Sequence, residues 1–265
     1  MKEITSRENE IIKQAVRIKQ KKYRQKEGLY LIEGHKMLRE VMAGPQTLVR
    51  VFMTHDSLEV HESKLRELSG VECYLVDERL MSLICDTQTP QGIAALVRIP
   101  HYDLRSLLNN KEGLLLLLDR IQDPGNMGTI LRTAWGFPVD GVLLTADCVD
   151  PFGPKAVRAS MGGIFHVPVM ESITLEILKD FKEAGYQIMG SEPAADKTLF
   201  DQDLTGGRII VIGNESRGIG NDVLNLCDHY FRIPLNPRVD SLNAAMACAI
   251  IAVEALRQRS SGQLS

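Results

Sequence analysis

Residues 208–220 read Arg-Ile-Ile-Val-Ile-Gly-Asn-Glu-Ser-Arg-Gly-Ile-Gly. The apolar run predicts a buried strand, and it passes directly into a loop of glycines and polar side chains. A second strand end follows at Phe231–Leu235, and Asp240–Asn243 precedes an apolar helix. Open α/β sheets bind ligands where their strands end, so these three segments predict one binding site.

The glycines of this loop match neither common nucleotide-binding pattern. Gly213, Gly218 and Gly220 are spaced G-x-x-x-x-G-x-G, and Ile219 stands where a P-loop carries its lysine. A Rossmann fingerprint, G-x-G-x-x-G at the start of a helix, is also absent. The pattern argues against a nucleotide-dependent oxidoreductase. It leaves open a plain tight turn that uses glycine for its positive φ.

The composition is that of a soluble globular protein, with 44% hydrophobic and 25% charged residues in a chain of 265. That length predicts one large or two medium domains. No apolar run approaches the roughly 20 residues of a membrane span, and the N-terminus does not resemble a signal peptide. The cysteines are scattered and form no C-x-x-C, which favours a reducing, cytoplasmic location and no metal site: Cys73, Cys85, Cys148, Cys227 and Cys248.

The net charge of −3 conceals a basic N-terminus. Residues 1–26 hold nine basic and three acidic side chains, whereas residues 101–265 hold 15 basic and 20 acidic ones. Basic residues occur without any acidic one at Lys13, Arg17, Lys19, Lys21, Lys22, Arg24 and Lys26. A basic patch on a mildly acidic chain indicates nucleic-acid binding, although most charge runs are only solvated helix faces.

The first part of the chain predicts a small α/β domain over residues 1–99. A basic helix spans residues 6–26, with Ser6 as its candidate N-cap. Predicted strands and helices then alternate: strands at 30–32, 48–53, 71–76 and 93–99, and helices at 35–42, 58–68 and 78–85. The polar segment 100–113 reads as a linker.

Residues 114–265 predict a second α/β domain with a parallel sheet. It opens with five consecutive leucines, Leu114–Leu118, a run that suits a strand buried on both faces. The helix after this strand carries Arg132, which we expect near its start. Further strands are expected at 141–145, 165–169, 186–191, 209–212 and 229–235, and helices at 154–161, 175–184 and 242–259.

Three motifs occur in order along the chain: Asn126-x-Gly128-x-x-x-Arg132, Gly213-Asn-Glu215-x-x-Gly218, and Ile233-Pro234 with Ser241-Leu242-Asn243. Together they resemble the motifs of the SpoU/TrmH family of RNA ribose 2′-O-methyltransferases, in the SPOUT superfamily. The segment from Lys155 to Gly162 is also similar to that family, and residues 22–34 resemble its small substrate-binding domain. The resemblance covers nearly the whole chain, and three ordered motifs are far more specific than any one alone.

The resemblance implies a fold in which the C-terminal domain contains a deep trefoil knot. It is preceded by a small α/β RNA-binding domain of the ribosomal-protein type. Physical rules alone would argue against a knot, because true knots are essentially absent from folds. The implied cofactor is S-adenosylmethionine, with Gly213, Ile233 and Leu242 as its expected contacts. Adenosylmethionine has no pyrophosphate, which fits the missing phosphate-binding glycines.

The implied reaction is methyl transfer to a ribose 2′-hydroxyl, most readily in ribosomal RNA. Arg132 is the family's catalytic arginine. A guanidinium is effectively always protonated, so we expect Arg132 to stabilise the developing alkoxide rather than to act as a base. Asn126 and Glu215 are expected to position Arg132 and the ribose. Of Ser241 and Asn243, one is expected to cap the last helix and the other to face the substrate.

Several alternatives remain open from the sequence. One is a transfer RNA substrate, and another is a catalytically inactive RNA-binding protein of the same fold. Each site residue, taken alone, could be an ordinary turn, cap or surface residue. The chain also departs from the family in having Pro237 where glycine is usual, and Ala244-Ala245-Met246 in place of Val-Ser-Val.

Two further expectations concern partners. The expected RNA-binding residues are Lys19, Lys21, Lys22 and Arg24. The last helix places Leu242, Ala245, Met246, Ala249, Val253 and Leu256 on one face. By resemblance this region forms a homodimer of about 59 kDa, twice the 29.5 kDa chain.

Overall fold

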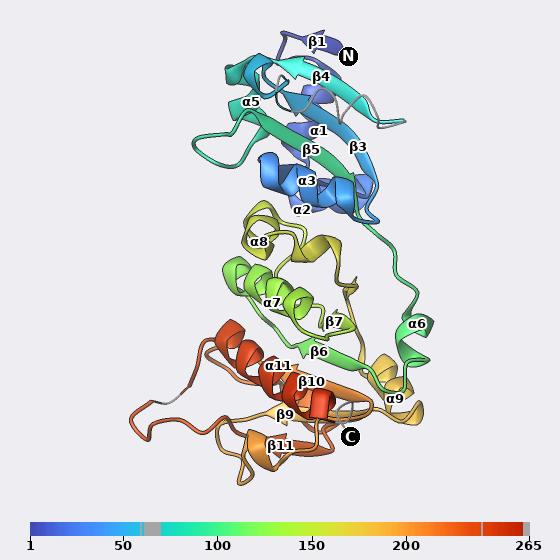
Figure 1. Ribbon diagram of the computed structural model, residues 1–265, viewed down its shortest axis with the longest axis vertical. Helices are drawn as coiled ribbons and strands as arrows, with labels where there is room; N and C mark the ends of the chain where they lie inside the picture. The colour runs from blue at the N-terminus through green and yellow to red at the C-terminus, as the bar shows by residue number, and fades with distance from the viewer. Residues whose placement is uncertain (59, 61–69, 240, 262–265) are drawn as a thin grey trace. The chain divides into compact units, whose positions relative to one another are not determined.

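The computed structural model describes residues 1–58, 60, 70–239 and 241–261. The chain divides into two compact units, each with its own sheet (Figure 1). The first consists of Met1–His101 and Phe152–His166, and the second of Tyr102–Pro151 and Val167–Ser265. The predicted boundaries at 99 and 114 placed Phe152–His166 in the second domain. In the structure this segment packs with the first unit, because its helix contacts strand β2.

The first unit is built on a mixed sheet whose described strands are β1 (Lys2–Ile4), β2 (Leu29–Glu33), β3 (Leu48–Met53), β4 (Glu72–Val76) and β5 (Ile93–Arg98). Their order is β1-β4-β3-β5-β2. Strand β5 runs antiparallel to both β2 and β3, while β4 is parallel to β3 and β1. The alternation predicted for this domain is confirmed, and the edge strand β1 was missed.

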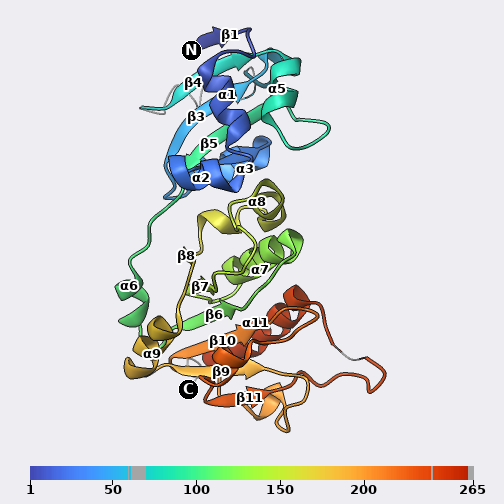
Figure 2. The same cartoon turned by 180° about the vertical axis from the view of Figure 1, so that it is seen from behind.

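The helices of this unit whose bounds lie within the described residues are α1 (Glu10–Arg17), α2 (Lys21–Glu27), α3 (His35–Ala43), α5 (Glu78–Ile84) and α8 (Pro154–Ser160), the last followed by the 3₁₀ turn η1 (Gly163–Phe165). Helices α1 and α5 contact each other (Figure 2). They share one apolar cluster with Leu29, Leu31 and Leu96 of the sheet. Helix α3 contacts strands β2 and β5. The predicted helix 58–68 falls almost wholly on residues outside the described part of the chain.

The predicted helix 6–26 is wrong as a single helix. Asn9, not Ser6, is the N-cap of α1, because its side chain accepts a hydrogen bond from Ile11 N–H at 2.9 Å. The chain turns after Ile18 and starts α2 at Lys21. Arg24 Nη1 donates to the carbonyls of Ile18 and Lys19 at 2.8 and 2.7 Å. This side chain satisfies carbonyls at the end of α1 that a continuous helix would have bonded internally.

The second unit is built on a wholly parallel sheet, which confirms the predicted class. Its described strands are β6 (Leu114–Leu118), β7 (Gly141–Leu144), β8 (Val169–Met170), β9 (Gln187–Ser191), β10 (Arg208–Ile212) and β11 (His229–Phe231), in the order β11-β9-β10-β6-β7-β8. After β6 the chain moves outward to β7 and β8, then returns on the other side of β6. The loops after β6 and β10 therefore flank a topological switch point.

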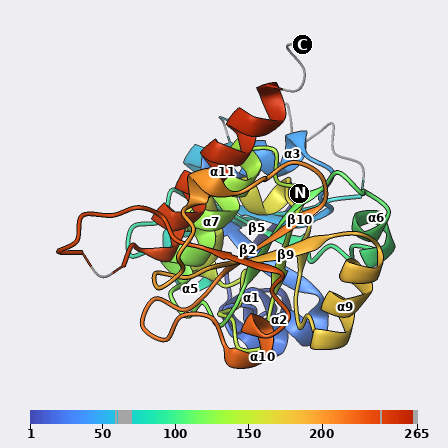
Figure 3. The same ribbon diagram turned by 90° about the horizontal axis from the view of Figure 1, so that it is seen from below.

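Helices cover both faces of this sheet, which explains why all five leucines of β6 are buried. They are α6 (Leu104–Leu108), α7 (Pro124–Gly136), α9 (Leu175–Glu183), α10 (Asn221–Leu224) and α11 (Ala244–Ser261), with a 3₁₀ turn, η2, at Leu199–Asp201. Leu115 and Leu117 pack with residues of α6, α9 and α10. Helices α7 and α11 pack against each other on the opposite side of the sheet (Figure 3).

Three details of residues 100–170 differ from prediction. Residues 163–165 form a 3₁₀ turn, and the strand that follows is only Val169–Met170 rather than 165–169. The predicted linker 100–113 contains helix α6, whose Leu107 is buried in the apolar cluster. Arg132 lies in the second half of α7, not near its start, because Asp123 caps the helix and Pro124 begins it.

Candidate functional site

One carboxamide joins the three sequence motifs. Asn126 lies in the first turn of α7, directly beyond β6. Its Nδ2 donates to Glu215 Oε1 in the loop after β10, and its Oδ1 accepts from Asn243 Nδ2 at 2.8 Å. Residues separated by as many as 117 positions in sequence thus meet at the switch point. Both polar atoms of the Asn126 amide are engaged, which fixes its orientation.

The sequence left open whether Ser241 or Asn243 caps the last helix, and the hydrogen bonds of Asn243 answer this. Its Oδ1 accepts from the backbone N–H groups of Ala245 and Met246 at 2.9 and 3.3 Å. Asn243 is therefore the N-cap of α11, and its amide nitrogen is still available to hold Asn126. Ser241 is exposed and lines the cavity described next.

A cavity of about 460 Å³ lies beside this cluster. Gly213, Ile233 and Leu242, the three residues predicted to contact a cofactor, all line it. Its lining combines residues of the loop after β10, such as Gly213, Asn214 and Gly218, with apolar residues such as Leu235 and Ala247. Charged groups reach it from Glu192, Glu215 and Arg232. The volume is in the range of small-molecule sites, and the mixture of apolar wall and few polar groups is typical of them.

The glycines of the loop after β10 serve two different physical needs. Gly218 has φ +64°, which any residue with a Cβ adopts only at a cost. Gly213 does not have a positive φ, but a Cβ there would lie 2.3 Å from the carbonyl carbon of Gly218. Backbone hydrogen bonds in both directions between Asn214 and Gly218 close the loop. The tight-turn interpretation is thus correct for Gly218, whereas Gly213 is required by close backbone approach.

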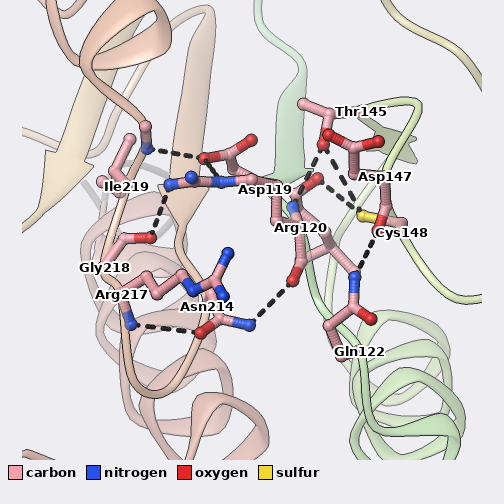
Figure 4. Close-up of polar contacts among 12 residues, drawn as sticks. Asp119, Arg120, Gln122, Thr145, Asp147, Cys148, Asn214, Arg217, Gly218 and Ile219 are labelled. Atoms are coloured by element: carbon pink, nitrogen blue, oxygen red, sulfur yellow. Dashed lines mark hydrogen bonds and ion pairs between the residues drawn. The ribbon is translucent and has the colours of Figure 1, made fainter.

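A buried carboxylate that the sequence analysis missed holds this loop in place. Asp119, at the end of β6, is 3% exposed and its Oδ2 accepts from Gly220 N–H at 2.7 Å (Figure 4). Arg120 Nε lies 3.2 Å from the same oxygen, and Arg120 Nη2 donates to the Gly218 carbonyl at 3.3 Å. Asp119 directly follows the leucine run, so a search for polar residues after each buried strand would have found it.

The backbone at Arg120 is also fixed on both sides. Its φ of +56° is uncommon for a residue with a side chain. Its N–H donates to Thr145 Oγ1 at 3.0 Å, and its carbonyl accepts from Asn214 Nδ2 at 3.0 Å (Figure 4). Burial raises the pKa of the Cys148 thiol, which stays protonated and donates to the Leu118 carbonyl at 3.2 Å. The loops after β6, β7 and β10 therefore form one connected framework.

Pro237, where the family usually has glycine, fits its turn without strain. Asn236 and Val239 are joined by a hydrogen bond from Val239 N–H to the Asn236 carbonyl at 2.9 Å. Asn236 Oδ1 also accepts from Arg238 N–H at 3.0 Å. Asparagine at the first position and proline at the second are favoured in such a turn, and no positive φ is needed there.

Comparison with known proteins agrees with this geometry. The model of the SpoU rRNA Methylase family matches residues 113–253, and that of the MRM3-like substrate binding domain matches residues 9–95. The chain belongs to the SpoU rRNA methylase family. The substrate-binding model covers the small N-terminal domain, and the methylase model covers the parallel-sheet domain that follows it.

Relatives within the family span nearly the whole chain. An uncharacterised tRNA/rRNA methyltransferase from Synechocystis sp. is 35% identical over 97% of this chain and 94% of its own length. The Bacillus subtilis 23S rRNA (guanosine(2553)-2′-O)-methyltransferase RlmP is 31% identical over 95% of this chain and 98% of its own. The crystal structure of AviRb from Streptomyces viridochromogenes with AdoMet superposes with a TM-score of 0.88, at 27% identity, covering 96% of this chain and 99% of that one.

The arginine expected to be catalytic in this SpoU methylase stands apart from the cluster. Arg132 lies on the exposed stripe of α7, with Thr129 and Trp135. Its position is six residues beyond Asn126, which turns it about 120° around the helix axis. Glu215 is bonded to Asn126, and within the described residues no hydrogen bond or ion pair joins it to Arg132. The expected Arg132–Glu215 pair is therefore absent from this structure.

Only some of the cations in the basic N-terminal segment are exposed and accessible to RNA. Lys13 pairs with Glu8 and Glu10 at 3.3 and 3.1 Å, and Arg17 lies 3.5 Å from Glu10. Lys19 Nζ donates to the carbonyls of Leu83 and Cys85. Arg24 is 4% exposed, so its prediction as a residue that contacts RNA does not fit this structure. The exposed cations of the segment are Lys21, Lys22 and Lys26.

Two other expectations concern absences. In the described ranges, no group of three or more His, Cys, Asp or Glu side chains is arranged to hold a metal ion. No helix in the described part of the chain is both long enough and apolar enough to span a membrane.

Proposed function

We propose that this protein transfers a methyl group from S-adenosylmethionine to a ribose 2′-hydroxyl of ribosomal RNA. The observation that carries the proposal is the Asn126 amide, which binds Glu215 and Asn243 at the edge of a cavity lined by Gly213, Ile233 and Leu242. Membership of the SpoU family supports it, since relatives named as 23S rRNA 2′-O-methyltransferases match most of the chain.

The residues of the cavity suit adenosylmethionine. The cofactor has no phosphate, and neither a P-loop nor a Rossmann glycine pattern is present. The loop after β10 contributes polar residues to the cavity, while Ile233, Leu235 and Leu242 offer apolar surface for the faces of the adenine. When bound, S-adenosylmethionine supplies an electrophilic methyl group on a sulfonium centre. We assign its binding to Gly213, Ile233 and Leu242.

The chain's own task is to align the ribose oxygen and to stabilise its charge. A 2′-hydroxyl is a weak nucleophile at neutral pH, so positioning and electrostatic stabilisation supply the rate. We propose that Asn126, Glu215 and Asn243 form a fixed polar surface against which the target ribose is held. Ser241, exposed at the mouth of the same cavity, is placed to donate a hydrogen bond to the substrate.

We propose Arg132 as the cation that stabilises the developing alkoxide and contacts the adjacent phosphate. A guanidinium does not release its proton at neutral pH, which excludes it as the base. Its exposed position on α7 leaves the guanidinium accessible to RNA. Because Arg132 stands about 120° from Asn126 around the helix, bound RNA or a second chain must complete the arrangement.

We propose that this second chain is another copy of the same protein. Helix α11 exposes Met246, Ile250, Val253 and Leu256 at fractions of 55, 38, 52 and 38%. Their spacing of four, three and three residues forms a single apolar stripe. Trp135 on the neighbouring helix α7 is 43% exposed as well. A twofold contact between two such stripes buries both, and it places the two Arg132 side chains beside the interface.

We further propose that the C-terminal segment is knotted. Strand β11 is at one edge of the sheet, yet α11 packs against α7 and β10, so the chain returns from the edge toward the centre. At the start of α11, Asn243 meets Asn126, beside the closed loop of residues 213–220. Passage of this segment through a loop of the same domain accounts for the three distant motifs at one point.

The test is to map 2′-O-methylation in total RNA from cells with and without the gene. We expect one ribosomal RNA nucleotide to lose its methyl group. A lost methyl group in transfer RNA instead would overturn the ribosomal assignment. Unchanged methylation everywhere, with RNA binding intact, would show a catalytically inactive RNA-binding protein of the same fold.

A further inference from the structure

We propose that Glu192 binds the ribose hydroxyls of the cofactor and so fixes which way the cofactor lies in its cavity. The inference rests on the proposed function, because it assumes an adenosine-containing ligand. Glu192 directly follows strand β9 and lines the same cavity as Gly213, Ile233 and Leu242. It belongs to none of the three motifs that define the family site.

Glu192 differs from the other charged groups of the cavity in having no strong partner. Glu215 is bonded to Asn126, and the Arg232 guanidinium donates to the carbonyls of Ala195 and Asp196. In the part of the chain that the structure describes, the only hydrogen bond to the Glu192 carboxylate is a long one, from Ile219 N–H to Oε1 at 3.4 Å. At least one carboxylate oxygen therefore remains available for a ligand.

The strand order indicates which part of the cofactor this carboxylate meets. The sheet edge runs from β6, which precedes Asn126, to β10, which precedes Glu215, then to β9 and finally β11. Neighbouring strands lie about 4.8 Å apart. The transferred methyl group must lie near Asn126 and Glu215, where we place the target ribose. Glu192 is one strand farther along, and the apolar Ile233 and Leu235, after β11, are farther still.

This series matches the order of groups in an adenosine cofactor. The sulfonium is joined through one carbon to the ribose, and the ribose to the adenine. With the methyl group at Glu215 and the adenine against Ile233 and Leu235, the ribose falls at Glu192. A carboxylate that accepts hydrogen bonds from ribose hydroxyls at a strand end is also the solution used in dinucleotide-binding sheets. The amino-acid end of the cofactor then lies away from Glu192.

Binding of two ligands to the full chain tests this placement. S-adenosylhomocysteine carries both the ribose and the amino-acid group, whereas 5′-deoxy-5′-methylthioadenosine keeps the ribose hydroxyls and lacks the amino-acid group. We expect Glu192→Ala to weaken both ligands by a similar factor, on the order of ten- to a hundredfold, with a smaller loss in Glu192→Gln. Titration calorimetry measures the affinities.

The control is Asp196→Asn, which removes an exposed carboxylate from the same connection but outside the cofactor cavity. We expect it to leave both affinities unchanged. If Glu192→Ala weakens S-adenosylhomocysteine but not methylthioadenosine, Glu192 faces the amino-acid end and the inference is wrong. If neither ligand responds to the substitution, it is wrong as well. Wild-type protein that binds neither ligand would overturn the proposed function itself.

Discussion

The basic N-terminal segment and the strand-end loops of the second unit carry opposite kinds of sequence signal. Residues 13–26 contain seven basic and no acidic side chains, a signal visible at a glance. In the structure, several of these basic side chains form ion pairs with Glu8 or Glu10, or donate hydrogen bonds to backbone carbonyls. The strand-end residues are ordinary one by one, yet they meet at a single amide. A conspicuous run of charge in one segment can thus serve the fold, whereas residues scattered along the sequence come together to form the candidate site.

The largest expected effect comes from the dispersed site. Arg132→Ala should lower the rate of methyl transfer at least about 10²- to 10³-fold, as removal of a group that stabilises developing charge does. Affinity for S-adenosylmethionine should not change, because Arg132 does not line the cavity. Arg105→Ala, an exposed arginine on α6, is the control and should keep full activity. Loss of cofactor binding by a folded Arg132→Ala protein would show that Arg132 is misplaced.

Gly213→Ala should act on the cofactor rather than on chemistry. The new Cβ would lie 2.3 Å from backbone of Gly218, so the loop must move and the cavity wall with it. We expect at least about a tenfold loss of cofactor affinity and a fall of roughly 1–3 kcal/mol in the free energy of unfolding. Gly136→Ala is the matched control, since a Cβ there meets nothing within 4 Å. Wild-type affinity in Gly213→Ala would contradict the assigned wall.

The apolar stripe of α11 should decide assembly. Ile250→Asp combined with Val253→Asp places charges where we propose that two copies meet, so light scattering should find the 29.5 kDa monomer in place of the dimer. Glu254, the residue directly after Val253, is buried, so it is left unchanged. If the wild-type chain is itself a fully active monomer at micromolar concentration, the proposed interface does not exist.

The smallest expected effects separate the two kinds of cation in the basic segment. Lys21, Lys22 and Lys26 changed together to Gln should leave stability unchanged and flatten the slope of log RNA affinity against log salt by about two to three. Arg24→Gln should instead destabilise the fold by roughly 1–3 kcal/mol, because two carbonyls at the end of α1 lose their charged donor. The distinction fails if the triple variant keeps the wild-type slope.

Much of the fold was predictable because periodicity reports burial directly. The leucine run of β6 and the apolar run of β10 gave correct strands, and the ordered motifs gave the family. The break between α1 and α2 was not predictable, since it depends on the buried guanidinium of Arg24, which reads in sequence as one more surface charge. The predicted second domain and the matched SpoU segment both include residues 152–166, yet helix α8 of this segment packs on strand β2 of the first unit, a contact that periodicity does not report.

The candidate site was predictable in its members and less so in its contacts. Motif order identified Asn126, Glu215 and Asn243, but not that Asn243 would both cap α11 and hold Asn126. Asp119 and Glu192 each stand directly after a strand, a position that marks them as candidates, but only the three-dimensional structure shows what each carboxylate faces. The expected pairing of Glu215 with Arg132 failed because the helical turn carries Arg132 to another face of α7.

The central claim is that these strand-end residues form a site for ribose methylation. The most direct measurement is transfer of labelled methyl from S-adenosylmethionine to purified ribosomal RNA, followed by complete nuclease digestion and mass spectrometry of the nucleosides. The account predicts a single 2′-O-methylated nucleoside with wild-type protein and none with Arg132→Ala. A methyl group on a base, or equal labelling by the two proteins, would contradict it.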